Sequence, residues 1–293
     1  AWSNTSNRRE SFTKVELFKL VLVRWSILLL LACAVIGISH INPVGRKDHT
    51  EKSARRKVQN LKVFGSLGAM LSIIATPIGN LGDITLRSIE TLKACDAIVC
   101  EDTRVTGQLL KHLDIPKKEF ISCHGYTKPE KVDGILDRLK AGEHLVMVSD
   151  AGTPGISDPG YALVSRAREE GIKMEALPGP SAFLTALSVS GLPINQFVYM
   201  GFPPLKKGRQ TLFKSFAEEK RTIVLYESVH RIEKTLNEIA DALSEQPDRK
   251  VVVARELTKM YEEITHTTVA ELKATAADMT KKGEFVVIVG AER

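Results

Sequence analysis

The chain has 293 residues, enough for one large domain or two of medium size. Hydrophobic residues make up 43% and charged residues 26% of the sequence, which is typical of globular proteins and excludes a disordered or collagen-like chain. The four cysteines, Cys33, Cys95, Cys100 and Cys123, form no CxxC pair. The sequence therefore favours reduced thiols over a disulfide scaffold, a zinc ribbon or a redox motif.

The formal net charge of +6 is distributed unevenly along the chain. Residues 1–69 contain 12 Lys or Arg and 4 Asp or Glu, whereas residues 70–293 contain 29 basic and 31 acidic residues. The larger part of the chain has no basic excess that would attract it to nucleic acid. RNA binding by this part requires local patches, of which Lys206, Lys207 and Arg209 form one candidate.

The first 69 residues differ from the rest of the chain in pattern as well as in charge. The uncharged stretch 26–39 is short for a membrane span, which needs roughly 20 apolar residues, and a polar, basic run follows at 46–62. The first methionine is Met70, and a strand-like pattern begins directly after it. We favour an upstream extension to a protein that starts at Met70, over a membrane anchor or a cleaved presequence. Membrane contact is expected only if residues 1–69 are genuine.

From Met70 onward, apolar strand-like runs alternate with segments of helical spacing. The runs lie at residues 71–75, 97–100, 120–123, 145–149, 172–177, 197–200, 223–226, 251–254 and 285–289. Helical spacing is clear in Leu86, Ile89 and Leu92, and again in Val132, Ile135, Leu136 and Leu139. Gly142 and Gly171 are expected at helix C-termini. The alternation predicts an α/β protein with at least partly parallel sheets.

The best internal boundary is the stretch 188–196 (SVSGLPINQ), which carries Gly, Pro and Asn after an Ala-containing helical segment. It predicts an N-terminal α/β domain over 70–190 and a C-terminal α/β domain over 197–293.

Ligands of α/β sheets bind beyond the carboxyl ends of the strands, so the loops after the predicted strands are candidate binding loops. The first contains Pro77, which stiffens the chain, and Gly79, which lets the backbone approach a ligand closely. Asp83 is expected to cap a helix that begins near Ile84. Since the loop has no GxGxxG or Walker A pattern, a dinucleotide site has weak support, and a plain tight turn is an equally good interpretation.

The loop 149–160 (SDAGTPGISDPG) is unusual because its twelve residues include three Gly, two Pro and two Asp. Asp150, Thr153 and Ser157 can offer hydrogen bonds, and the absence of Lys favours an uncharged or zwitterionic ligand over a polyphosphate. In the loop 178–182, Ser181 can both cap the next helix and line a pocket.

Charged residues follow several other strands. Asp102 and Arg104 are expected in a salt-bridged helix start, and His124 at the end of a strand has either a structural or a functional role. Glu227 is solvated or paired with an arginine, or it belongs to the site. No HExxH, GxSxG or Cys/His metal spacing occurs in the sequence, which disfavours a metallohydrolase or a serine hydrolase and predicts no metal.

Taken together, the segments ATPIGNLGDIT, EDTR, SDAGTPGISDPG, PGPSA, GFPP, YESVHR and VARELTK resemble, in this order, the ribosomal RNA small-subunit methyltransferase I family. That family is part of the tetrapyrrole-methylase-like methyltransferases, and the resemblance covers residues 70–293. It implies a two-domain α/β, class III methyltransferase fold with S-adenosylmethionine in the interdomain cleft. It also implies a cytoplasmic homodimer that methylates a cytidine ribose 2′-OH in the decoding region of 16S ribosomal RNA, within the small ribosomal subunit.

By matched motif, the resemblance implies a cofactor site formed by Pro77, Gly79, Asp150, Ala151, Gly152, Thr153, Ser157, Ser181 and Ala182. A ribose 2′-OH is a weak nucleophile, so a base or a cation near it would assist the reaction. From their positions at strand ends, Asp102, His124 and Glu227 are our candidates for the base or hydrogen-bond acceptor, and Arg104 for the cation.

Two alternatives remain open. One is a tetrapyrrole C-methyltransferase of the same superfamily, acting on a precorrin or uroporphyrinogen, which the first loop, ATPIGNLGD, disfavours. The other is a non-catalytic module that binds S-adenosylmethionine or RNA without turnover.

Overall fold

The computed structural model describes residues 69–125, 127–158 and 160–292, which belong to one compact unit. They form two five-stranded sheets, the first from β1 to β5 and the second from β6 to β10. The prediction of an α/β protein with partly parallel sheets is therefore confirmed. The predicted N-terminal extension lies outside the described residues, apart from Ala69.

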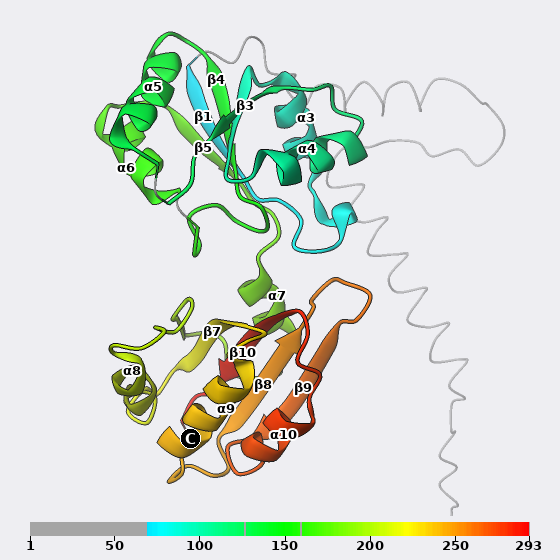
Figure 1. Ribbon diagram of the computed structural model, residues 1–293, viewed down its shortest axis with the longest axis vertical. Helices are drawn as coiled ribbons and strands as arrows, with labels where there is room; N and C mark the ends of the chain where they lie inside the picture. Colours follow the sequence, from blue (N-terminus) through cyan, green and yellow to red (C-terminus); the bar gives the residue numbers. More distant parts are fainter. Residues whose placement is uncertain (1–68, 126, 159, 293) are drawn as a thin grey trace, which may run out of the picture. The chain divides into compact units, whose positions relative to one another are not determined.

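The first sheet is parallel throughout, with the strand order β3-β2-β4-β1-β5. Its strands are β1 (Met70–Ile74), β2 (Ala97–Cys100), β3 (Glu119–Ser122), β4 (His144–Val148) and β5 (Met174–Leu177). Figure 1 shows helices on both faces: α3 (Leu86–Ala94) and α4 (Thr103–His112) on one, α5 (Pro129–Lys140) and α6 (Tyr161–Glu169) on the other. Because both faces are buried, the strands read as continuous apolar runs rather than alternating ones.

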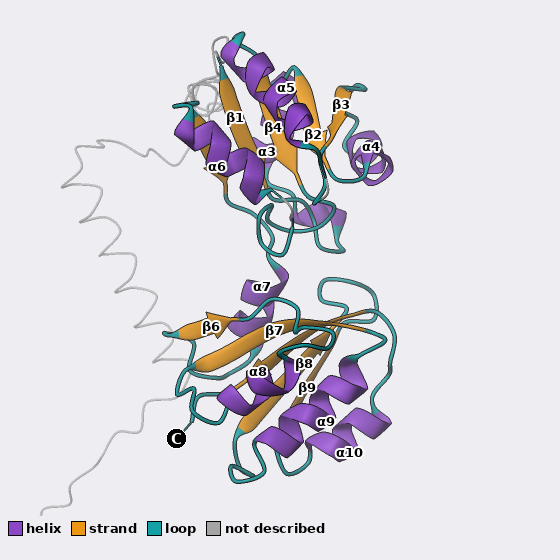
Figure 2. Cartoon of the chain, turned by 60° about the vertical axis from the view of Figure 1, so that its left-hand side comes forward, coloured by secondary structure: helices purple, strands orange, loops and turns teal. Residues whose placement is uncertain are grey.

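The second sheet is mixed, with the order β6-β7-β10-β8-β9 and only β6 and β7 running parallel. Its strands are β6 (Phe197–Tyr199), β7 (Thr222–Ser228), β8 (Lys250–Arg255), β9 (Glu263–Thr268) and β10 (Glu284–Val289). The helices α8 (Arg209–Ser215), α9 (Ile232–Ala242) and α10 (Leu272–Asp278) pack on one face, as Figure 2 shows. The strand β9 was not predicted.

The other face of the second sheet is covered by α7 (Ala182–Val189). Phe183 and Leu187 of this helix share a buried cluster with Val252 and Ile288 of the sheet. The predicted division into domains 70–190 and 197–293 would assign α7 to the first domain, although its side chains pack on the second sheet. The division itself stays a prediction.

Two glycines lie at helix C-termini as predicted, whereas the aspartate that was predicted to cap a helix N-terminus does not do so. Gly142 and Gly171 have φ values of +103° and +69° just beyond α5 and α6, a backbone conformation that suits glycine. Asp83 does not cap a helix at Ile84, since it closes a short 3₁₀ turn, η1 (Leu81–Asp83), capped by the side chain of Asn80. Thr85 caps α3 instead, accepting from the Ser88 N–H at 3.1 Å.

In the part of the chain described, no helix is long and apolar enough to cross a membrane. The uncharged stretch 26–39 lies outside that part.

Candidate functional site

Strand order brings the three predicted binding loops together. The strands β4, β1 and β5 are neighbours, so the loops that follow them leave the same edge of the first sheet. Thr76 and Gly152 exchange two backbone hydrogen bonds of 2.9 and 3.0 Å, which join the first loop to the second. The Thr153 hydroxyl donates to the Pro180 carbonyl at 3.1 Å and joins the second loop to the third.

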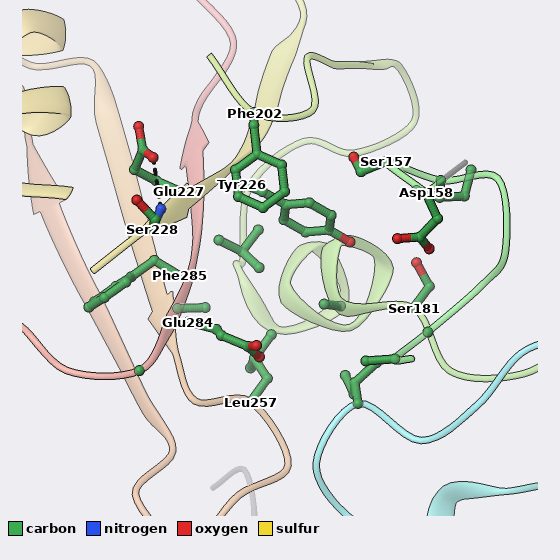
Figure 3. Close-up of a pocket in the computed structure, with 18 of the residues that line it drawn as sticks. Ser157, Asp158, Ser181, Phe202, Tyr226, Glu227, Ser228, Leu257, Glu284 and Phe285 are labelled. Carbon is green, nitrogen blue, oxygen red and sulfur yellow. Dashed lines mark hydrogen bonds between the residues drawn. The ribbon is translucent and has the colours of Figure 1, made fainter. Parts of the chain in front are cut away.

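These loops border a cavity of about 470 Å³, shown in Figure 3. Seven of the nine residues predicted to bind the cofactor line it: Asp150, Ala151, Gly152, Thr153, Ser157, Ser181 and Ala182. The other two, Pro77 and Gly79, flank Ile78, which is a lining residue. A Cβ on Gly79 would lie 2.5 Å from Cγ of Lys259. Because glycine has no side chain, the loop after β1, which carries Gly79, can pack closely against the loop between β8 and β9, which carries Lys259.

The opposite wall comes from the second sheet and its loops, and Glu227 is the one residue of this wall that the sequence analysis named individually. It includes Phe202, Tyr226, Leu257 and Phe285. These side chains follow or belong to apolar strands. An apolar run in the sequence does not distinguish a side chain of the core from a side chain that contacts a ligand.

Two tyrosines of the second sheet form hydrogen bonds with segments that follow strands of the first sheet: the start of α7 and the loop after β4. The Tyr226 hydroxyl accepts the Phe183 N–H at 3.2 Å and so takes the place of a side-chain cap at the start of α7. Ser181 occupies the N-cap position of α7, but its side chain makes no capping bond. The Tyr199 and Ser157 hydroxyls are 2.5 Å apart. Ser157 has a φ of +65°, so this contact is made by a strained residue.

Asp158 also lines the cavity, although the sequence did not single it out as a site residue. Burial, together with the nearby carboxylates of Glu101 and Asp150, raises the pKa of Asp158 to about 6. Figure 3 shows its side chain on the same side of the cavity as Ser157 and Ser181. A carboxylate whose pKa lies close to neutral pH, in a cavity with several hydroxyls, can accept a proton from a bound ligand.

Three of the four predicted catalytic residues lie outside the cavity lining. Asp102 caps α4 and binds Arg104 at 2.6 Å, which confirms the predicted salt-bridged helix start. Hydrogen bonds from Arg104 lower the pKa of Asp102 to about 2, so this carboxylate is a weak base. The Arg104 side chain is 86% exposed, and His124 is an exposed residue just after β3.

The fourth, Glu227, contributes to the cavity wall, but its carboxylate points to the other face of β7 (Figure 3). Side chains alternate along a strand, so Tyr226 faces the cavity and Glu227 faces α8 and α9. There Arg231 is 2.8 Å from its Oε1, and the Thr235 hydroxyl donates to its Oε2 at 2.6 Å. This arrangement does not fit a base that contacts substrate.

The predicted basic patch contains Lys206, Lys207 and Arg209, and the prediction is wrong for Arg209, which is buried. Arg209 is only 3% exposed, because its guanidinium binds Glu238 at 2.7 Å and donates to Thr235 at 2.6 Å. Lys206 and Lys207 are exposed.

Sequence comparison agrees with the resemblance drawn from the motifs. A family model described as Tetrapyrrole (Corrin/Porphyrin) Methylases matches residues 70–273. A protein of Escherichia coli O157:H7 named ribosomal RNA small subunit methyltransferase I is 48% identical over 222 residues, which is 75% of this chain and 77% of that protein. Its namesake from Vibrio cholerae is 47% identical over 227 residues, 76% of this chain and 78% of that protein.

Among solved structures, a cobalt precorrin-4 methyltransferase of cobalamin biosynthesis superposes with a TM-score of 0.57 at 21% identity. The match covers 76% of this chain and 95% of that enzyme, which shows a shared fold. Together with the cavity between the motif loops and the second sheet, these matches confirm the family read from the sequence: the chain belongs to the ribosomal RNA small subunit methyltransferase I family of the tetrapyrrole methylases.

Proposed function

We propose that the protein transfers a methyl group from S-adenosylmethionine to the ribose 2′-OH of a cytidine in the decoding region of 16S ribosomal RNA. One observation carries the proposal: the loop 149–160, the most specific motif of the family resemblance, contributes residues 150–153 and 156–158 to the wall of the cavity of about 470 Å³. The chain that carries this loop is nearly half identical to proteins named as small-subunit methyltransferases.

The cavity fits S-adenosylmethionine in size and in chemistry. Its volume of about 470 Å³ lies within the range of small-molecule sites, and apolar Ile78 and Leu257 can cover a purine ring. The hydroxyls of Ser157 and Ser181 can bind polar groups of a ribose or an amino acid. Gly152, at φ +82°, holds the backbone in a turn that brings it close to a ligand.

We propose that Asp150, Ala151, Gly152, Thr153, Ser157, Ser181 and Ala182 hold the cofactor, while Pro77 and Gly79 stiffen the loop that carries Ile78. When bound, S-adenosylmethionine supplies a methyl group on a positively charged sulfur. The chain must then place the 2′-oxygen in line with that group and exclude water, and such positioning contributes much of the rate.

Asp158 is the best-placed acceptor for the 2′-OH proton. It lines the cavity, and its raised pKa makes it a stronger base than an ordinary aspartate while it stays ionised at neutral pH. We therefore propose Asp158 as the general base, in place of the sequence-based candidates Asp102 and Glu227.

The remaining candidates receive substrate-binding roles. The Arg104 guanidinium donates through Nε and Nη2 to the Asp102 carboxylate, while the rest of the exposed group stays open to solvent, which suits a contact to an RNA phosphate. We propose His124, at the exposed carboxyl end of β3, as a further RNA contact. We also propose the assembled small subunit as the substrate and a homodimer as the active form.

A two-substrate incubation tests the function. The protein is supplied with methyl-labelled S-adenosylmethionine and either small ribosomal subunits that lack the modification or a uroporphyrinogen. We expect label in 16S ribosomal RNA, in a dinucleotide that resists alkaline hydrolysis because its 2′-oxygen is blocked. Label in the tetrapyrrole and none in RNA would instead support the C-methyltransferase alternative. Cofactor binding without label in either substrate would support a non-catalytic module.

A further inference from the structure

Phe202 is a large apolar side chain on the cavity wall that remains 52% exposed. It lies in the turn 201–204 (GFPP), between β6 and α8. Gly201 has a φ of +60°, and its carbonyl accepts the Tyr226 N–H at 2.9 Å. Pro203 and Pro204 then fix two further φ angles. The turn is therefore rigid, although the ring it carries is only half covered.

Two arginines clamp this turn from the helix side of the second sheet. The Arg231 Nη1 donates to the Pro203 carbonyl at 2.9 Å, and the Arg209 Nη1 donates to the Pro204 carbonyl at 3.1 Å. Prolines have no N–H, so their carbonyls are the backbone groups through which the turn can be held.

Glu227 orients both arginines. Its side chain is fully buried, with Arg231 at 2.8 Å and Arg209 at 3.8 Å from its oxygens. The Ser228 N–H and the Thr235 hydroxyl also donate to Glu227, at 2.7 and 2.6 Å. A buried carboxylate with this many donors is well compensated, and its position fixes those of the two guanidinium groups.

Aromatic side chains support the Phe202 ring from within the protein. Its centroid is 5.5 Å from that of Tyr226, which is in turn 5.4 Å from Tyr199, and Tyr199 stacks on Phe183 at 4.6 Å. The row runs from the buried start of α7 to the exposed rim of the cavity. An exposed ring on a fixed base loses little entropy when a second ring stacks on it.

We propose that Phe202 is the stacking surface for the nucleobase of the target nucleotide, and that Glu227, Arg209 and Arg231 are positioning residues that hold it at the cavity rim. Unpaired bases bound by proteins commonly stack on aromatic side chains, and an enzyme that modifies one nucleotide must separate it from its neighbours. This inference rests on the proposed methylation of RNA, and it adds a residue that selects and orients the substrate.

Substitutions at Phe202 test the stacking. We expect Phe202→Ala to raise the KM for unmethylated small subunits by roughly 5- to 150-fold, with the Kd for S-adenosylmethionine unchanged. Phe202→Trp should behave like the native protein, and Phe202→Leu like Phe202→Ala, since leucine is apolar but has no aromatic face. Leu86→Ala is the matched control, because Leu86 is 81% exposed on α3 and is not a lining residue.

Native-like behaviour of Phe202→Leu would overturn the proposal, and so would a loss of cofactor affinity as large as the rise in KM. An unchanged KM in Phe202→Ala would do the same.

A double-mutant cycle tests the clamp. Arg231→Lys keeps the charge beside Glu227 but cannot bond the carboxylate and the Pro203 carbonyl together with the geometry of arginine. We expect it to raise the KM for small subunits while the protein stays folded. In Phe202→Ala/Arg231→Lys we expect a KM no higher than in Phe202→Ala. Multiplicative effects on KM would show that Arg231 acts independently of Phe202.

A fluorescence measurement separates this inference from the proposed function. Phe202→Trp is made in a chain whose two tryptophans, Trp2 and Trp25, are replaced by phenylalanine. We expect unmethylated small subunits, but not S-adenosylmethionine, to quench the new tryptophan. Quenching without methylation would refute the proposed function but support the role of Phe202 as a stacking surface. Methylation without quenching would refute that role.

Discussion

At the scale of single residues, the Asp158 carboxyl shows how its surroundings set its chemistry. The same loop holds Asp150, whose Oδ1 accepts the Asp102 N–H at 3.0 Å and so braces the backbone before α4. Asp158 lines the same cavity as Asp150, but burial and neighbouring carboxylates raise its pKa to about 6. The first environment suits a structural role and the second suits a base.

Asp158→Asn is predicted to lower kcat by about 10²–10⁴-fold, the usual contribution of a general base. In the native protein kcat/KM should fall as the pH drops through about 6, because the carboxylate must be ionised to accept a proton. The folded-state pKa is raised above its value in the unfolded chain, so ionisation of Asp158 destabilises the fold at neutral pH. Asp158→Asn should therefore raise the melting temperature while activity falls.

The measurements are a pH–rate profile and thermal unfolding at pH 7. Asp83→Asn serves as the control, because Asp83 is an exposed residue of η1 that is not among the cavity-lining residues. Native kcat in Asp158→Asn would remove Asp158 from the mechanism.

Arg104→Ala is predicted to weaken binding of small subunits and to change its salt dependence. If Arg104 neutralises one phosphate, the slope of log affinity against log salt should decrease in magnitude by about 0.7–0.9. The control is Arg168→Ala, at the end of α6, where the helix has returned to the opposite edge of the sheet. An unchanged slope in Arg104→Ala would show that this side chain does not contact RNA.

The role of Glu227 could not be predicted from the sequence. The run TIVLYES contains no polar alternation that tells which face of the strand each side chain occupies. The partners of Glu227 come from α8 and α9, so only the packed structure reveals the cluster. The same packing removes Arg209 from the predicted basic patch.

At the scale of elements, the adjacency of β4, β1 and β5 explains why the loops that follow these strands could be predicted as binding loops from the sequence. Seven of the nine predicted cofactor residues line one cavity because parallel neighbours end at the same edge. The strand β9 (EITHTT) was missed because it lies at the edge of its sheet and needs no continuous apolar run. The helix start at Thr85 was missed because Ile84 and Thr85 have extended backbones after the Asn80-capped turn.

A pair of glycine substitutions tests the contact between Ala75, the residue that follows β1, and the loop after β5. A Cβ on Gly179 would lie 2.8 Å from Cβ of Ala75, so Gly179→Ala should push the loop away and displace Ser181. We expect lower stability and weaker binding of S-adenosylmethionine. Gly134→Ala, in the exposed middle of α5 with no atom within 4 Å of the new Cβ, should stabilise the fold by about 0.5–1 kcal/mol.

Chemical denaturation and equilibrium dialysis measure the two effects. Equal stability of Gly179→Ala and the native protein would contradict the close packing of this loop on Ala75.

At the scale of the whole molecule, the overall charge is a poor guide to function. The +6 combines a +8 balance in residues 1–69 with −2 in residues 70–293, and the described residues hold the cavity and its rim. Under the proposed function, recognition of RNA depends on local contacts such as those proposed for Arg104 and Phe202, rather than on a general attraction to polyanions.

A chain that begins at Met70 is predicted to keep its KM for small subunits and to lose affinity for unrelated RNA at about 50 mM salt, where non-specific charge attraction is strongest. Filter binding to an unrelated RNA and a methylation assay measure the two properties. Loss of methylation by the shortened chain, while it remains folded, would show that residues 1–69 contribute to the reaction.

A map of 2′-O-methylated positions in ribosomal RNA, from cells with and without this protein, tests the proposed methylation in its natural setting. We predict that removing the protein abolishes one 2′-O-methylcytidine in the decoding region of 16S ribosomal RNA. Supplying the native chain should restore it, and supplying Asp158→Asn should not. An identical map from both kinds of cell would refute the proposed methylation.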